Sequence, residues 1–237
     1  MDELTLQNQL IIVTVLIGIT YLSSFKSGKP ICNRYLINHF LHLTTIITLY
    51  IYFINVFDDK KIKRNITSLI ISIVLLIVLS IIYQKTTNIL LKYILIILII
   101  GTLAFLSERY YKKYDKEEFK KVVIKLIGIL LICIFIAIFF PGIMKPKIEY
   151  YLFFCLLILL LSRLVDYFFL NKKYDTIIST LVIIVFSGFM IYDTKRVLDF
   201  KKLCINKGVQ PNYLTNIFNM FINILNMFNN LLNIEGS

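Results

Sequence analysis

Long apolar segments recur through this chain and constrain its fold more than any other feature. A helix that crosses the hydrocarbon core of a bilayer needs roughly 20 apolar residues, whereas a spanning strand needs about 10 with alternating polarity. Lipid offers the backbone no hydrogen-bond partners, so segments of the longer kind are helical. The sequence therefore predicts an all-α, polytopic membrane helix bundle of seven to eight transmembrane helices, forming one integral membrane domain over 1–237. The apolar segments are 9–24, 36–57, 66–83, 89–107, 122–140, 150–170, 176–194 and 213–234.

The composition excludes most classes of water-soluble protein. Hydrophobic residues make up 58% of the 237 residues, against about half in soluble domains. The net charge of +12 lies almost entirely in short connections, such as 58–65, 108–121 and 194–212. Basic connections of this kind set membrane topology and attract anionic headgroups. The lipid bilayer is therefore the expected partner, and nucleic acid is not.

The same basic connections predict an orientation. If all eight segments cross, the basic residues divide almost evenly between the two sides. If 150–170 is an inserted or non-spanning helix, most of them gather in the cytosol, including those of 194–212. The positive-inside rule thus favours seven crossings with 194–212 cytosolic. Segment 150–170 is nevertheless apolar enough to span, so both alternatives stay open.

Polar residues interrupt the last two apolar segments. Asp193 comes at the end of 176–194, and Asn219, Asn223, Asn226 and Asn230 follow one face of the last segment. An acid at the end of a membrane helix is costly and suggests a functional site, and Asn side chains can bond neighbouring helices. We expect a buried polar site here, which favours a channel, leak or sensor. Two alternatives remain: Asp193 can snorkel at the membrane edge, and the Asn residues can serve helix packing alone.

Other polar residues suggest less specific roles. Arg163 and Asp166 lie three residues apart and can form an intramembrane pair, either as a gate contact or as a self-neutralising pair. His39 and His42 share a helix face, but no third ligand accompanies them, so no metal site is predicted. No Gly-rich phosphate loop, HExxH or GxSxG motif occurs. We therefore expect no catalytic residues, no cofactor and no enzyme activity.

Five short motifs occur along the chain in a fixed order. They are Leu4-Thr5-Leu6-Gln7 with Val13-Thr14, Lys60-Lys61-Ile62-Lys63-Arg64-Asn65, Tyr114-Asp115 with Phe119, Tyr192-Asp193-Thr194, and Tyr213 with Asn219 and Asn226. In the order and spacing of these motifs the chain resembles the Bax inhibitor-1, or transmembrane Bax-inhibitor motif, family, and within it the Lifeguard-like branch. Two positions depart from the family pattern: Lys195 stands where the family has Gln, and Asn223 stands where it has an acid. The chain also has one apolar segment more than the family.

The resemblance implies a function and a site. In the family two acids form a hydrogen-bonded, proton-sensitive pair that opens or closes an ion path, and the matching positions are Asp193 and Asn223. Because Asn does not ionise, any pH response here should be a single transition of Asp193.

The implied activity is modulation of calcium leak from intracellular stores, with suppression of apoptosis as its outcome. Calcium would be the permeant ion, other apoptosis-regulating membrane proteins would be partners, and the endoplasmic reticulum or Golgi membrane of a eukaryotic or viral system would be the location. The rival functions are a structural virion or organelle membrane protein without transport, and a small transporter.

Overall fold

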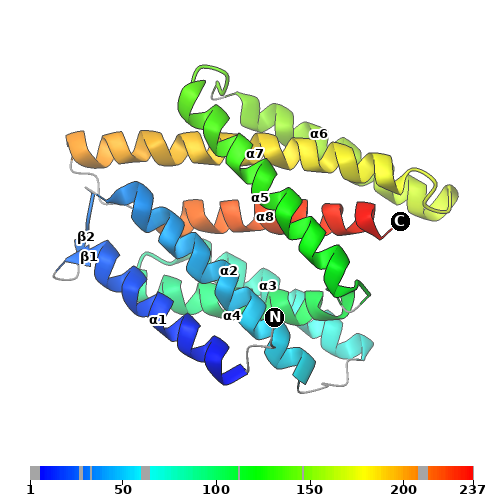
Figure 1. Ribbon diagram of the computed structural model, residues 1–237, viewed down its shortest axis with the longest axis horizontal. Helices are drawn as coiled ribbons and strands as arrows, with labels where there is room; N and C mark the ends of the chain where they lie inside the picture. The colour runs from blue at the N-terminus through cyan, green and yellow to red at the C-terminus, as the bar shows by residue number, and fades with distance from the viewer. Residues whose placement is uncertain are drawn as a thin grey trace. The chain divides into compact units, whose positions relative to one another are not determined.

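Eight α-helices account for nearly all of the described chain (Figure 1). The computed structural model describes residues 6–26, 29–32, 34–59, 65–111, 113–145, 147–207 and 213–236. Two strands, β1 (Phe25–Lys26) and β2 (Lys29–Pro30), form a short antiparallel ladder after the first helix. The predicted all-α class is confirmed. The helices are α1 (Leu6–Ser24), α2 (Tyr35–Asp59), α3 (Ile66–Lys85), α4 (Ile89–Tyr111), α5 (Lys116–Phe139), α6 (Ile148–Phe169), α7 (Asp175–Lys207) and α8 (Tyr213–Glu235).

Local sequence signals explain where several helices begin and end. The Asn65 side chain accepts a hydrogen bond from the Ser68 backbone N–H at 2.8 Å and caps α3. Asp115 and Glu118 form a reciprocal capping box at the start of α5. Such caps satisfy backbone N–H groups that the first turn leaves without partners. Parts of two quoted motifs, residues 4–5 and 60–64, lie outside the described residues.

The chain divides into two compact units. One unit contains residues 1–113 and 208–218, and within it α1 packs on α2, while α4 packs on both α2 and α3. The other unit contains 114–207 and 219–237, and within it α7 packs against α5 and α6. Both candidate polar pairs of the sequence, Asp193 with Asn223 and Arg163 with Asp166, fall inside the second unit.

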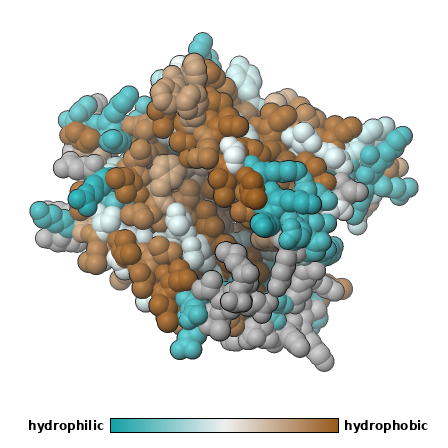
Figure 2. Space-filling view, in the orientation of Figure 1, coloured by the Kyte–Doolittle hydropathy of each residue, from teal (hydrophilic) through white to brown (hydrophobic). Residues whose placement is uncertain are grey.

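The outer surfaces of the helices are apolar, as a bilayer requires. Leu22, Leu90 and Phe169 are 76%, 71% and 77% exposed, and similar side chains recur along α3 and α6. Figure 2 shows hydrophobic side chains over much of the face in view. Among the described residues, seven helices, α1 to α7, are long and apolar enough to cross a membrane. They include α6, which the charge count favoured as non-spanning, whereas the Asn-rich α8 is not among them.

Helix α7 is longer than the sequence predicted. We expected a connection over 194–212, but the helix continues to Lys207 and has 33 residues, or about 50 Å at 1.5 Å per residue. The prediction was wrong because it took the charged residues after Asp193 as the end of the helix. Met190, Val197 and Cys204 are all buried, so one apolar face continues past those charges. Asp193 consequently lies inside a helix and not at its end.

The side of the membrane that holds the end of α7 can be measured by thiol labelling. The predicted topology places Lys202 and Glu117, both exposed, in the cytosol and Gly142 on the opposite side. In sealed vesicles with the cytosolic face outward, an impermeant thiol reagent should label Lys202→Cys and Glu117→Cys above the unsubstituted protein, and Gly142→Cys should be protected. Protection of Lys202→Cys with labelling of Glu117→Cys would mean that α6 crosses the membrane.

Candidate functional site: a buried Asp–Asn pair between α7 and α8

Asp193 is a buried carboxylate in the middle of a long helix. Its exposed fraction is 5%, and that of the neighbouring Thr194 is 1%. The Thr194 hydroxyl donates a hydrogen bond to the Met190 carbonyl at 2.8 Å, so Thr194 finds its partner within α7. A buried carboxylate is costly unless other groups donate hydrogen bonds to it or balance its charge. The partners of Asp193 therefore decide what this position can do.

The partner of Asp193 is Asn223 of α8. The Asn223 Nδ2 atom donates a hydrogen bond to Asp193 Oδ2 at 2.7 Å, and Asn223 is itself 7% exposed. A carboxylate accepting from an amide forms a charge-assisted bond, which is stronger than a bond between two neutral groups. The structure thus brings together the two residues that the family resemblance paired across the last two helices.

The rest of the contact between α7 and α8 is weakly polar. Ser187, six residues before Asp193 on α7, donates its hydroxyl proton to the Ile183 carbonyl of its own helix at 2.8 Å, and its hydroxyl oxygen lies 3.6 Å from the Met227 sulfur of α8. On the opposite side, Cys133 of α5 donates to the Ser187 carbonyl at 3.6 Å. Bonds to sulfur are weaker than bonds between oxygen and nitrogen. Near the middle of α7, the strong polar contact with α8 among the described residues is therefore the Asp193–Asn223 bond.

Charged residues surround one face of α7 next to Asp193. Arg196, three residues further along the helix, and Glu149 at the start of α6 both act electrostatically on the Asp193 carboxylate. A cavity of about 430 Å³ opens on this face of the unit. Its lining mixes both signs of charge with a few apolar side chains, so the cavity is polar. The lining residues are Met144, Glu149, Tyr192, Lys195, Arg196, Asp199, Phe200 and Leu203.

Sequence reasoning missed the contributions of Glu149 and Arg196. Arg196 carried a usable signal, because side chains three residues apart share a helix face and Asp193 was already a candidate. Glu149 carried none, since it is distant in sequence and its proximity depends on how α6 packs on α7. Among the described residues, no group of three or more His, Cys, Asp or Glu side chains is arranged to hold a metal ion.

The predicted Asn stripe divides into residues with different roles. Asn219 is exposed on α8, whereas Asn223 is buried against Asp193. Asn226 is half-buried and donates to the Ile222 carbonyl of its own helix at 2.8 Å. Asn230 is buried and donates to the Asn226 carbonyl at 2.8 Å. Among these four Asn residues, all of them in the part of the chain that the structure describes, only Asn223 makes a hydrogen bond to Asp193.

Arg163 takes different partners from those the sequence suggested. No hydrogen bond or ion pair of the described residues joins it to Asp166. Its guanidinium donates to the Ser179 hydroxyl at 2.6 Å and to Asn230 Oδ1 at 2.9 Å, and it lies 3.3 Å from an Asp175 carboxylate oxygen. Arg163 therefore links α6, α7 and α8 near the start of α7, whereas Asp193 lies in the middle of that helix.

Asp166 instead shapes the turn between α6 and α7. It is 2% exposed, and its carboxylate accepts a hydrogen bond from the Tyr174 backbone N–H at 3.0 Å. Its own carbonyl accepts from the backbone N–H groups of Leu170 and Lys172. Side chains of this kind replace the backbone partners that a helix loses at its end. The three-residue spacing of Arg163 and Asp166 was correct for a shared helix face, but tertiary contacts offered each residue a better-placed partner.

Comparison with known proteins identifies the family. A family model described as an inhibitor of apoptosis-promoting Bax1 matches residues 29–237, which include α2 to α8 and both members of the buried pair. No curated protein and no solved structure matches the chain. The match covers most of the chain and agrees with the seven helices of the described residues that are suited to spanning a membrane. The chain belongs to the Bax inhibitor-1 family of multi-pass membrane proteins.

Proposed function

We propose that this protein is a slow calcium leak of an intracellular membrane, in the endoplasmic reticulum or Golgi, and that the leak suppresses cell death by lowering the calcium content of the store. The observation that supports the proposal is the buried bond from Asn223 to Asp193 at 2.7 Å. It occupies the positions of the proton-sensitive acid pair of the family and joins two helices. The protein would act without a cofactor and without enzymatic chemistry.

The Asp193–Asn223 bond is suited to act as a latch. With Asp193 ionised the bond is charge-assisted and holds α7 to α8. Protonation leaves a bond between two neutral groups, which stabilises less. The neighbouring cavity, with Glu149 and Asp199 in its lining, supplies the oxygen ligands that Ca²⁺ prefers. We propose that weakening the latch connects this cavity to the opposite side of the membrane.

Removal of the charge at Asp193 is the first test. In Asp193→Asn the side chain keeps its shape and can still bond Asn223, but the charge-assisted part of the bond is lost, roughly 1.5 kcal/mol or about tenfold in an equilibrium. We expect the basal calcium leak of reconstituted vesicles to rise by up to about tenfold at neutral pH.

The matched control is Glu117→Gln. Glu117 lies in the same unit but is exposed and does not line the cavity, so its substitution should leave both the closed state and the calcium ligands intact. Both variants are compared at equal amounts of inserted protein, with elution from a sizing column as the check on folding. Unchanged leak in Asp193→Asn would contradict the latch. Absence of calcium flux from the unsubstituted protein, with intact insertion, would favour the structural role that is the rival function.

A further inference from the structure

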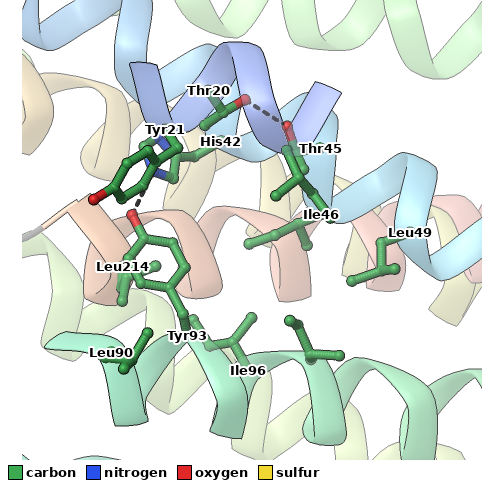
Figure 3. Close-up of a pocket in the computed structure, with 12 residues that line it drawn as sticks. Thr20, Tyr21, His42, Thr45, Ile46, Leu49, Leu90, Tyr93, Ile96 and Leu214 are labelled. Carbon is green, nitrogen blue, oxygen red and sulfur yellow. Dashed lines mark hydrogen bonds between the residues drawn. The ribbon is translucent and has the colours of Figure 1, made fainter. Parts of the chain in front are cut away.

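The unit formed by residues 1–113 and 208–218 contains a cavity that the leak proposal does not use. Its volume is about 240 Å³, and its lining comes from α1, α2, α4 and the first turn of α8 (Figure 3). Most of the lining is aliphatic, and the polar atoms come from two hydrogen-bonded pairs and from Tyr21, whose hydroxyl points away from the other labelled residues in Figure 3. The lining residues are Ile17, Thr20, Tyr21, His42, Thr45, Ile46, Leu49, Leu90, Tyr93, Ile96, Ile97 and Leu214.

The first polar pair is His42 with Tyr93. His42 Nδ1 lies 2.7 Å from the Asn38 backbone carbonyl, which can only accept, so Nδ1 carries the proton. His42 Nε2 lies 2.6 Å from the Tyr93 hydroxyl. His42 is 3% exposed and no acidic side chain lines the cavity, which favours the neutral ring because an unbalanced buried charge is costly. Nε2 then accepts, and the Tyr93 hydroxyl must donate to it.

The second polar pair is Thr20 with Thr45, whose hydroxyl oxygens lie 2.8 Å apart. Thr45 also donates to the Leu41 carbonyl of its own helix at 2.8 Å. A hydroxyl has one proton, so Thr45 can only accept from Thr20, and Thr20 is the donor. Figure 3 shows both pairs bordering the cavity.

Both pairs therefore leave oxygen atoms in the cavity that can still accept a hydrogen bond. The hydrogens of Tyr93 and Thr20 are committed to His42 and Thr45, and the lone pairs of their oxygens remain. The aromatic ring of Tyr213 stacks on His42, with centroids 5.1 Å apart and an interplanar angle of 12°, which fixes the ring in this arrangement. At these two pairs, a molecule in the cavity meets apolar walls and oxygen atoms that accept but do not donate.

The cavity also opens toward the apolar exterior. Tyr21 of α1 and Leu90 of α4 are 58% and 71% exposed while lining it. Since α1 and α4 are helices suited to spanning a membrane, this opening faces lipid. A cavity of about 150 Å³ holds a benzene molecule, so this larger one admits one end of a lipid, with the remainder lying between the helices and the bilayer.

We propose that this cavity binds a lipid-like alcohol, a molecule with a long apolar body and a single hydroxyl that donates to Tyr93 or Thr20. A sterol and a linear long-chain alcohol share this chemistry. An ether or ketone of the same shape has no proton to donate, so it makes no such bond. The site is independent of Asp193 and of the proposed leak.

Photolabelling with a defined probe tests the proposal. The full-length protein in phosphatidylcholine vesicles is labelled with a long-chain alcohol that carries a diazirine in its chain, and labelled peptides are mapped. Unlabelled alcohol should compete about fivefold better than its methyl ether, the value of one hydrogen bond of about 1 kcal/mol. Cholesterol and a linear alcohol are compared as competitors. The stronger competitor shows whether the natural ligand is a sterol or a linear alcohol, and either result supports the proposed site.

Three variants and one control locate the binding. Ile46 is 5% exposed and lines the cavity, so Ile46→Phe should fill it and remove labelling of α1 and α4. Ile51→Phe, on the exposed side of the same helix, should label as the unsubstituted protein does. Thr20→Val and Tyr93→Phe each remove one of the two accepting hydroxyls and keep the rest of the side-chain shape, and at least one of them should weaken competition by the alcohol without affecting the ether.

Two results would overturn the proposal. Equal competition by alcohol and methyl ether would show that no donor is recognised. Competition by a ketone at the strength of the alcohol would show a protonated His42 with Tyr93 donating to the ligand. If Ile46→Phe fails to insert, Thr20→Val and Tyr93→Phe decide together: unchanged competition by the alcohol in both variants means that its hydroxyl does not bind in this cavity.

Discussion

Replacement of Asn223 by Asp should convert a single-proton pH response of the calcium leak into a two-proton response. In the natural protein the amide of Asn223 donates to Asp193 at 2.7 Å and does not ionise. Protonation of Asp193 is then the one titration that weakens the latch, so leak should rise once, as pH falls. In Asn223→Asp two carboxylates occupy the same contact. Carboxylates this close share one proton and titrate as a coupled pair.

The expected profile follows from the three protonation states of that acid pair. With one shared proton the two carboxylates form a strong charge-assisted bond, and leak should be lowest. With two protons the bond is neutral and weaker, and with none the two charges repel. Leak in Asn223→Asp should therefore rise on both sides of an intermediate pH, whereas the natural protein should show one transition.

The measurement is calcium release from identical vesicles across a pH series for both forms. Asn219→Asp is the matched control, because it adds the same charge one turn earlier on α8 at an exposed position. A second pH transition in Asn219→Asp would show that the second transition of Asn223→Asp comes from the added negative charge alone and not from its contact with Asp193. A two-proton response in the natural protein, or no change in Asn223→Asp, would show that Asn223 does not govern the titration.

Loss of Arg163 should destabilise the protein without changing this pH response. Arg163→Met keeps an aliphatic stem but leaves Ser179 and Asn230 without a donor and Asp175 without its ion pair. Hydrogen bonds to charged groups contribute about 1.5–3 kcal/mol each when buried, and Arg163 and Asp175 are each about one-third exposed, which weakens their ion pair. We expect the free energy of unfolding to fall by roughly 2 kcal/mol.

Thermal or denaturant unfolding in detergent, with two controls, measures this loss. Arg163→Lys keeps the charge but lacks the planar fork that reaches three partners, so it should recover only part of the stability. Lys173→Met removes an exposed charge from the turn beside it and should change stability by no more than about 0.5 kcal/mol. Wild-type stability of Arg163→Met would contradict the role of this cluster in joining α6, α7 and α8.

The sequence by itself determined the number of helices, their approximate bounds and the membrane character of the protein. These properties depend on segment length, apolar content and local caps, all of which act over neighbouring residues. The break after α5 at Pro141-Gly142 and the cap at Asp115 illustrate such local control. The length of α7 did not follow in this way, because buried Val197 and Cys204 extend the helix through residues that look like a charged connection.

Only the tertiary structure decided which polar groups meet. The sequence placed four Asn residues on one face of α8, but packing against α7 assigns Asn223 to Asp193, and packing against α6 assigns Asn230 to Arg163. Periodicity specifies a face, and it carries no information about the residues opposite that face on a distant helix. The same limit explains why His42 and Tyr93, 51 residues apart, gave no sign of a shared cavity until the helices that carry them were packed together.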